Sequence, residues 1–315
     1  MPEARAQRDV FGEYMCELTE EFASVLCLDG DLGTSTRADM VAACHPDRFL
    51  QMGIAEQNMF GVAAGLATMG FVPFISTFAC FAAKRAIDQV RVSIAQPKLS
   101  VKITGAYSGI LTGKTGKTHQ SVEDIAVMRA MPNMTVLVPA DATELRQMMR
   151  AAVLTPGPMY LRLTRDPFQT IFDDGYRFQI GKAAVLREGS DVAIIGTGVQ
   201  SVRALEAAED ILALDGISAY VLHVPCVKPL DVDAIVRAAE RTGVVLTVED
   251  HSIIGGLGGA VAEVLSERHP TPVKRMGLND VFGESAADQD LLEKYGLTPR
   301  HVAQAAVDAL RSAKH

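Results

Sequence analysis

The sequence predicts an α/β protein made of two doubly wound domains. Short apolar runs of strand length alternate with longer segments whose apolar residues recur at helical spacing, the pattern of a parallel sheet covered on both faces. The 315 residues, 48% of them hydrophobic, can bury more than one core. The 26 glycines suit the many tight turns that such a fold requires.

The first domain is expected to span residues 1–170 and to hold a mostly parallel sheet. Its expected strands are Ser24–Leu28, Arg48–Met52, Val72–Ile75, Leu99–Ile103, Thr135–Val138 and Met159–Leu163. Helical spacing predicts helices over Asp9–Glu20, Ala55–Met69, Phe78–Ser93 and Thr143–Leu154. Asp141 is a suitable N-cap for the last of these helices.

A second α/β domain is expected over residues 171–315. The segment Arg165–Gly181 contains an Asp-Pro pair and a Phe-Asp-Asp-Gly turn without sustained periodicity, which indicates a linker between the domains. The strands expected after it are Asp191–Ile195, Ala219–Val224, Val244–Val248 and Val273–Met276. Helices are expected to begin near Val199, Asp231, Gly258 and Pro299.

Composition excludes several classes of partner. The formal net charge of −8, with no basic cluster, argues against nucleic acid or an anionic membrane. The stretch Met1–Arg5 is too polar for a secretory signal, and no apolar run approaches the roughly 20 residues of a membrane span. The cysteines lack paired spacing, so we expect buried thiols in a cytoplasmic protein and neither a disulfide nor a metal site: Cys16, Cys27, Cys44, Cys80 and Cys226.

One carboxylate stands out in the segment 53–59, which reads Gly-Ile-Ala-Glu-Gln-Asn-Met. Glu56 is expected to begin a helix whose next apolar residues are buried. A carboxyl group in such a place is partly desolvated and can hydrogen-bond a heteroaromatic nitrogen. The alternative is a glutamate that only satisfies backbone amides at the helix N-terminus.

Aromatic rings and an imidazole follow at the ends of later elements. Phe78 and Phe81 are three residues apart at the expected start of a helix, so both rings should face the same way, in ordinary core packing or against a flat ligand. The polar, glycine-rich loop Gly105–Ser121 carries His119 within Thr-His-Gln. Loops of this kind at strand ends commonly carry function, and histidine is the usual group for proton transfer near neutral pH.

In that order, these segments resemble the pyrimidine-binding half of the transketolase family of thiamine diphosphate enzymes, and the resemblance continues through the C-terminal domain. It implies that Glu56 contacts the ring nitrogen of the cofactor's aminopyrimidine and promotes the tautomer that activates the thiazolium. It also implies that Phe78 and Phe81 pack on the aminopyrimidine, and that His119 binds sugar oxygens and assists proton transfer. Asp31 matches a family aspartate near the thiazolium and the subunit interface.

The same resemblance points to a sugar phosphate. Arg8, Ser35 and Arg165 occupy positions that resemble the family's phosphate ligands, and arginine suits bidentate phosphate contact. Each arginine could equally form a surface salt bridge.

Two positions depart from the family pattern. Thr115 stands where the family has an acidic residue that recognises a sugar hydroxyl. Tyr107 stands where the family has another histidine near the substrate phosphate. The identity of the sugars is therefore open. The neighbouring Lys114 and Lys117 either meet an anionic group of an unusual sugar or form a solvated basic loop.

The chain has no counterpart of the family's N-terminal half. The segment Asp29–Asp31 with Asn58 only superficially resembles the family's Gly-Asp-Gly…Asn signature, so no metal or diphosphate site is expected here. The resemblance implies an N-terminal partner subunit that carries Gly-Asp-Gly and holds most of the Mg²⁺, in an α2β2 heterotetramer with homodimeric contacts. The run Glu249–His251 invites a metal interpretation, but adjacent residues cannot all point one way.

The leading hypothesis is one subunit of an enzyme that transfers a two-carbon ketol unit from a ketose phosphate to an aldose acceptor. The runner-up is the beta subunit of a 2-oxo acid dehydrogenase complex, although the stretch from Phe81 to Thr118 is short for it. A deoxyxylulose phosphate synthase-like activity is a third interpretation. A half-protein kept for assembly or regulation is the non-enzymatic alternative.

Overall fold

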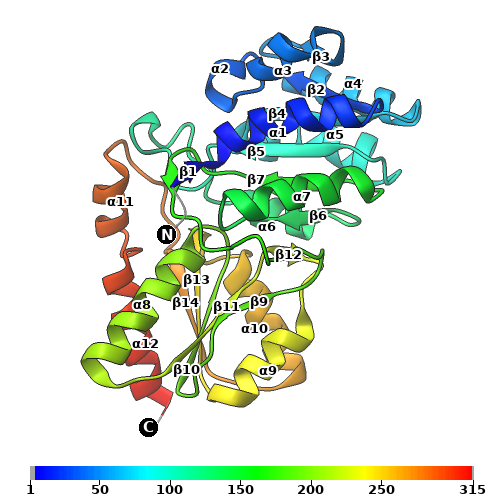
Figure 1. Cartoon of the computed structure of the whole chain (residues 1–315). Helices are drawn as coiled ribbons and strands as arrows, with labels where there is room; N and C mark the ends of the chain where they lie inside the picture. Colours follow the sequence, from blue (N-terminus) through cyan, green and yellow to red (C-terminus); the bar gives the residue numbers. More distant parts are fainter. Residues whose placement is uncertain (1–3, 314–315) are drawn as a thin grey trace.

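The structure, a computed structural model, describes residues 4–313, so Met1–Glu3 of the polar N-terminal stretch lie outside it. It has two α/β units, one above the other in Figure 1, each with helices on both faces of a sheet. The predicted fold class is confirmed. No helix among the described residues is both long and apolar enough to span a membrane.

The first unit is built on a seven-stranded sheet of order β12-β6-β7-β5-β4-β2-β3. All neighbouring strands are parallel except for the β12–β6 pair. The strands are β2 Val25–Asp29, β3 Phe49–Gln51, β4 Val72–Phe78, β5 Lys102–Ala106, β6 Thr135–Leu137, β7 Met159–Arg162 and β12 Cys226–Lys228. The six strands expected from the sequence are therefore all present.

Helices cover this sheet on both sides. They are α1 Gln7–Glu21, α2 Gly33–Thr36, α3 Asp39–Cys44, α4 Glu56–Thr68, α5 Ile87–Gln89, α6 Asp124–Ala130 and α7 Ala142–Leu154. Alternate residues of β2 show why two cores form: Val25 and Cys27 pack with α1 and α7, whereas Leu26 and Leu28 pack with α4 and α6. Asp141 caps α7 as predicted, because its carboxylate accepts the Glu144 N–H at 2.9 Å.

The helix expected over Phe78–Ser93 is wrong at its start and irregular throughout. Strand β4 continues through Phe78, which pairs with Ala106 of β5. Two π-helical segments, η2 Phe81–Arg85 and η3 Val90–Ala95, then flank the short α5. Hydrogen bonding to β5 extends β4 as far as Phe78, although the helical spacing of apolar residues already begins at Phe78.

The prediction of five unpaired thiols is also wrong. Helices α1 and α3 pack together, and Cys16 and Cys44 form a disulfide with their Cα atoms 6.4 Å apart. Their spacing of 28 residues gave no signal in the sequence. Cys27, Cys80 and Cys226 are buried free thiols, and burial raises the pKa of Cys80 to about 11 and of Cys226 to about 12.

The second unit has a five-stranded sheet of order β14-β13-β10-β11-β9, in which only β9 runs antiparallel to its neighbour. Its strands are β9 Ala184–Arg187, β10 Val192–Gly196, β11 Ala219–His223, β13 Val245–Ser252 and β14 Val273–Leu278. Its helices are α8 Gln200–Asp215, α9 Val232–Thr242, α10 Leu257–Arg268, α11 Asp288–Lys294 and α12 Pro299–Ala313. Helices α8 and α12 cover one face, and α9 and α10 cover the other. The four expected strands and the four expected helix starts are confirmed within a few residues, whereas β9 and α11 were not predicted.

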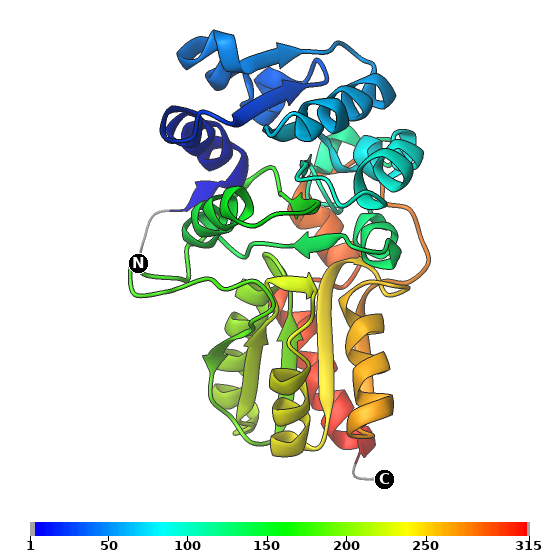
Figure 2. The same cartoon turned by 90° about the vertical axis from the view of Figure 1, so that its right-hand side faces the viewer.

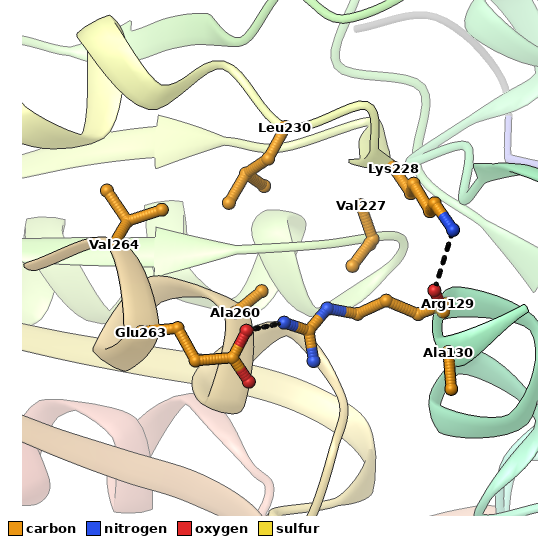
Figure 3. Close-up of a pocket in the computed structure, with 8 residues that line it drawn as sticks. All are labelled: Arg129, Ala130, Val227, Lys228, Leu230, Ala260, Glu263 and Val264. Atoms are coloured by element: carbon orange, nitrogen blue, oxygen red, sulfur yellow. Dashed lines mark hydrogen bonds and ion pairs between the residues drawn. The ribbon is translucent and has the colours of Figure 1, made fainter. Parts of the chain in front are cut away.

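The two units are tied together by backbone and side chains. Strand β12 leaves the second unit and completes the first sheet beside β6, at the junction seen in Figure 2. Figure 3 shows a pocket beside β12, where Lys228 Nζ donates to the Arg129 carbonyl at 2.9 Å and Arg129 pairs with Glu263 of α10. These cations are therefore used in holding α6 against the second unit.

A buried polar network completes the junction. Arg162 pairs with Asp124 at 2.8 Å and donates to the Asp250 carbonyl at 2.8 Å. His223 lies 2.9 Å from Glu144, both of them fully buried.

The run Glu249–His251 divides its side chains among separate partners. Glu249 accepts the N–H groups that begin α10, and Asp250 accepts the Ile110 N–H at 3.1 Å. His251 accepts the Ala126 N–H at 3.3 Å. Asp250 and His251 therefore fasten the second unit to the loop that carries His119 and to α6, whereas Glu249 acts within the second unit.

Candidate active site

A pocket of about 410 Å³ opens at the carboxyl edge of the first sheet. Ligands of open α/β sheets commonly bind at this edge. The lining residues come from the turn after β2, the start of α4, the segment after β4 and the glycine-rich loop: Gly30, Asp31, Leu32, Ile54, Glu56, Phe81, Arg85, Thr118 and His119. Sequence-predicted residues from four separate segments are thus brought together.

Glu56 is the first residue of α4 and is only 1% exposed. Both of its carboxylate oxygens accept hydrogen bonds from Arg85 Nη1, at 2.9 and 3.0 Å. The Arg85 guanidinium also lies 4.5 Å above the centre of the Phe81 ring. The buried carboxylate is therefore paired with a cation that covers an aromatic face.

The aromatic residues form a stack beneath this pair. The Phe78 ring lies 5.9 Å from that of Phe81 and 4.3 Å from that of Tyr107, at an interplanar angle of 22° in each case. His119 stands edge-on to Phe81 at 5.6 Å, and its Nδ1 hydrogen-bonds Thr118 Oγ1 at 2.8 Å. Phe78 and Phe81 thus face the same way as predicted, although Phe78 belongs to a strand.

The turn after β2 places Asp31 at the rim. Asp29 is buried and accepts the N–H groups of Leu32 and Gly33, each at 3.1 Å, and burial raises the pKa of Asp29. Asp31 adopts a left-handed φ of 64°, and its N–H donates to Gln51 Oε1 at 3.1 Å. Asp29 is therefore the residue that shapes the turn.

Two arginines converge on Tyr107 at the other side of the aromatic stack. Arg8 Nη1 donates to the Tyr107 hydroxyl at 2.8 Å and lies 3.4 Å from the Ser35 carbonyl oxygen. The Arg165 guanidinium lies 5.6 Å from the Tyr107 ring centre. Arg8, Ser35, Tyr107 and Arg165, which we call the arginine cluster, are thus neighbours in space.

Comparison with known proteins decides the family. The family model "Transketolase, pyrimidine binding domain" matches residues 3–169, and the model "Transketolase, C-terminal domain" matches residues 181–302. The chain belongs to the transketolase family.

Curated relatives match this transketolase-family chain over nearly its whole length. A "6-deoxy-6-sulfo-D-fructose transketolase subunit" from Clostridium sp. (strain MSTE9) is 43% identical, over 95% of this chain and 92% of the relative. A "putative transketolase C-terminal section" from Methanocaldococcus jannaschii is 42% identical, over 98% of this chain and 97% of the relative. The chain therefore corresponds to the C-terminal subunit of split transketolases, in a family that depends on thiamine diphosphate.

A solved structure agrees with this assignment. A protein described as "Split gene transketolase, inactive beta4 tetramer" is 47% identical, with a TM-score of 0.90 over 98% of this chain and 99% of the other.

Thr115, which departs from the transketolase pattern, lies outside the pocket lining. Its hydroxyl bonds Thr112 within the same turn, and Lys114 and Lys117 beside it are exposed. The structure thus gathers Glu56 and His119 in one pocket but leaves Thr115 at the surface of the loop.

Arg85 is a charged residue of the site that sequence reasoning missed. The adjacent cations Lys84 and Arg85, soon after Phe81, were the available signal. Lys84 turns away to pair with Glu123, whereas Arg85 enters the pocket. Among residues 4–313, no group of three or more Cys, His, Asp or Glu side chains is placed to hold a metal ion.

Proposed function

We propose that this chain is one subunit of a two-chain, thiamine diphosphate-dependent transketolase that transfers a two-carbon ketol unit between a ketose donor and an aldose acceptor. The observation that supports this most is the meeting of Glu56, Phe81 and His119 around a single pocket. A degenerate assembly module would not require this combination of groups.

The pocket suits an aminopyrimidine. A buried carboxylate lies beside a stacked aromatic face, and these two features complement a flat ring that carries a hydrogen-bonding nitrogen. Glu56 would hydrogen-bond that ring nitrogen, and Phe78 and Phe81 would support the ring, with Asp31 at the rim. When bound, the cofactor supplies the nucleophilic carbon that carries the ketol unit.

His119 is assigned to the substrate oxygens. Thr118 engages its Nδ1 atom, so Nε2 is the nitrogen that would hydrogen-bond the sugar's oxygens and transfer protons. Edge-on packing against Phe78 and Phe81 sets the ring orientation relative to the site we assign to the aminopyrimidine.

The arginine cluster is assigned to the anionic end of the sugar. Two guanidinium groups converge on Tyr107, Arg8 at its hydroxyl and Arg165 at its ring, and together they provide positive charge and several donors for a phosphate or sulfonate. The Clostridium relative is named for a sulfonated ketose. We therefore propose that Arg8, Arg165, Ser35 and Tyr107 bind the anionic group of a sugar. Because Thr115 stands where the family has an acidic residue, no particular sugar is assigned.

The diphosphate and Mg²⁺ are assigned mainly to an N-terminal partner subunit with a Gly-Asp-Gly motif. We propose an α2β2 assembly with contacts between identical subunits, a cytoplasmic location, and no nucleic acid or membrane partner. The description of a similar chain as an inactive beta4 tetramer is consistent with the need for a second subunit. We also place the domain boundary near residue 170.

The test is reconstitution. The chain is mixed with the candidate N-terminal subunit, thiamine diphosphate and Mg²⁺, and ketol transfer is assayed with phosphorylated and sulfonated ketoses. Glu56→Gln should lower kcat by about 100-fold or more, because the carboxyl group acts in proton transfer. Glu13→Gln, an exposed pair partner of Arg5, is the matched control and should leave kcat unchanged. Activity on 2-oxo acids alone, or none with any ketose, would reject the proposal.

A further inference from the structure

Arg85, the cation that lines the pocket, has no role in the function proposed above. Arg85 contacts both groups assigned to the aminopyrimidine, because it bonds the two oxygens of Glu56 and covers the ring of Phe81. An aminopyrimidine that hydrogen-bonds Glu56 and packs on Phe81 needs those same two surfaces. Arg85 and the cofactor ring therefore cannot both hold them.

Burial explains why Arg85 takes this position. Glu56 is 1% exposed, and a buried carboxylate without a partner is strongly unfavourable. Lys84 pairs with Glu123, so of these two neighbouring cations Arg85 is the one that compensates Glu56. Arg85 thus supplies the hydrogen bonds and the positive charge that the Glu56 carboxylate needs when no heteroaromatic nitrogen is present.

Arg85 is also well placed to leave. Its side chain is 49% exposed, so water already reaches part of it while the guanidinium is paired with Glu56. It is the last residue of the π-helical segment η2, a type of local irregularity that is frequent at functional sites.

We propose that Arg85 is an internal competitor for the pyrimidine pocket, and this inference rests on the proposed function. In the chain without cofactor, Arg85 pairs with Glu56 and covers Phe81. Cofactor binding in the two-chain assembly displaces it into solvent. Part of the binding free energy of the cofactor is then used to break the Glu56–Arg85 pair.

Calorimetric titration of thiamine diphosphate with Mg²⁺ into the reconstituted two-chain protein tests this directly. Arg85→Ala should bind about five to ten times more tightly than wild type, because the competitor is gone. Arg85→Gln, which keeps a neutral donor for Glu56, should also bind more tightly. Arg91→Ala removes the same charge from an exposed position on η3 and should bind like wild type.

Unchanged or weaker binding by both Arg85 variants would overturn the competitor role while leaving the proposed function intact. Absence of binding by the wild-type mixture would overturn the proposed function and, with it, this inference. The two failures are thus distinguishable.

A second measurement needs no cofactor. In urea unfolding of the isolated chain, a double-mutant cycle with Glu56→Gln and Arg85→Ala reports the strength of the pair. Arg85→Ala should destabilise the chain when Glu56 is present and have little effect in the Glu56→Gln background. Equal effects in both backgrounds would show that the pair is not formed in the free chain and would overturn the inference.

Discussion

At the scale of single residues, Tyr107 connects the aromatic stack to the arginine cluster. Its ring packs on Phe78, while its hydroxyl accepts from Arg8. Tyr107 holds this position with a left-handed φ of 56°. A non-glycine residue in this conformation directly after β5 is consistent with a functional constraint on its side chain.

Tyr107→Phe should therefore separate substrate affinity from turnover. The ring stack remains, so kcat should change by less than about twofold, while loss of a hydrogen bond to a charged group should raise KM for an anionic ketose about tenfold. Steady-state kinetics of the two-chain enzyme measure both constants. Tyr295→Phe, whose hydroxyl bonds the Phe282 carbonyl at 3.3 Å, is the control. An equal KM rise for a ketose without the anionic group would contradict the assignment.

Asp288 gives a prediction for pH. Burial raises the pKa of Asp288 from 3.8 to about 7, with a hydrogen bond to Asp166 as the next cause. Its folded pKa is raised, so its stabilising contribution is fully present below 3.8 and is lost as pH rises through about 7.

Between about pH 5 and about pH 8, the free energy of unfolding of the wild type should therefore fall relative to that of Asp288→Asn. The expected decrease is on the order of 1 kcal/mol, because solvent screens this partly exposed carboxyl group. Urea unfolding at the two pH values measures the difference. Parallel pH profiles of the two proteins would show that Asp288 titrates as it does in the unfolded chain. Asp290→Asn, on the same helix, controls for removal of one charge.

The resemblance of short segments to the transketolase family was enough to predict which groups meet in the pocket, but not how they pair. Glu56, Phe81 and His119 were predicted from that resemblance, and the structure brings them together. The partner of Glu56 was missed because Arg85 is 29 residues away and reaches the carboxylate only through the packing of η2 beside α4. Periodicity identifies buried faces and says little about such side-chain pairs.

At the scale of elements, the segment after β4 shows where periodicity fails. Residues 78–93 have helical spacing, yet pairing with β5 keeps Phe78 in a strand, and π-helical turns replace a regular helix. The disulfide between α1 and α3 has the same kind of cause, since only the packing of the two helices brings Cys16 near Cys44. The strands of both sheets were easier to predict, because apolar runs between turns depend on local composition.

Helix α4 contains two glycines at positions where contacts within this chain leave room for a larger side chain. A Cβ added at Gly61 or Gly65 would meet nothing within 4 Å, and glycine inside a helix costs about 1 kcal/mol relative to alanine. Gly61→Ala and Gly65→Ala should thus each stabilise the isolated chain by about 0.5–1 kcal/mol in urea unfolding.

The helix α4, which begins with Glu56, faces another subunit in the assembly that we propose. A side chain larger than alanine at Gly65 should then interfere with assembly. Gly65→Leu should leave the isolated chain folded and yet weaken assembly with the partner, as measured by analytical ultracentrifugation. Ala213→Leu, at an exposed position of α8 in the second unit, is the control. Unimpaired assembly of Gly65→Leu would show that this face of α4 lies outside the interface.

At the scale of the whole molecule, the second unit fixes the position of the loop that carries His119. Asp250 accepts the Ile110 N–H, and the Ser252 N–H donates to the Val122 carbonyl at 2.7 Å, so both ends of the loop that carries His119 are tied to β13. Apolar residues of the loop, including Ile110, Leu111 and Val122, share a core with α11. The C-terminal unit therefore holds His119 in place without lining the pocket.

Arg162 is a buried cation that joins the two units at this junction. It is 4% exposed and joins Asp124 of α6 to the Asp250 carbonyl of β13. Arg162→Met removes the cation and leaves Asp124 buried, so the free energy of unfolding should fall by about 3–5 kcal/mol. Because the chain has no tryptophan, urea unfolding is best followed by far-ultraviolet circular dichroism. Arg300→Met, which breaks the exposed pair with Glu293, should cost less than about 1 kcal/mol. A loss of similar size in the two variants would mean that the two units are held together mainly by apolar contacts and by strand β12.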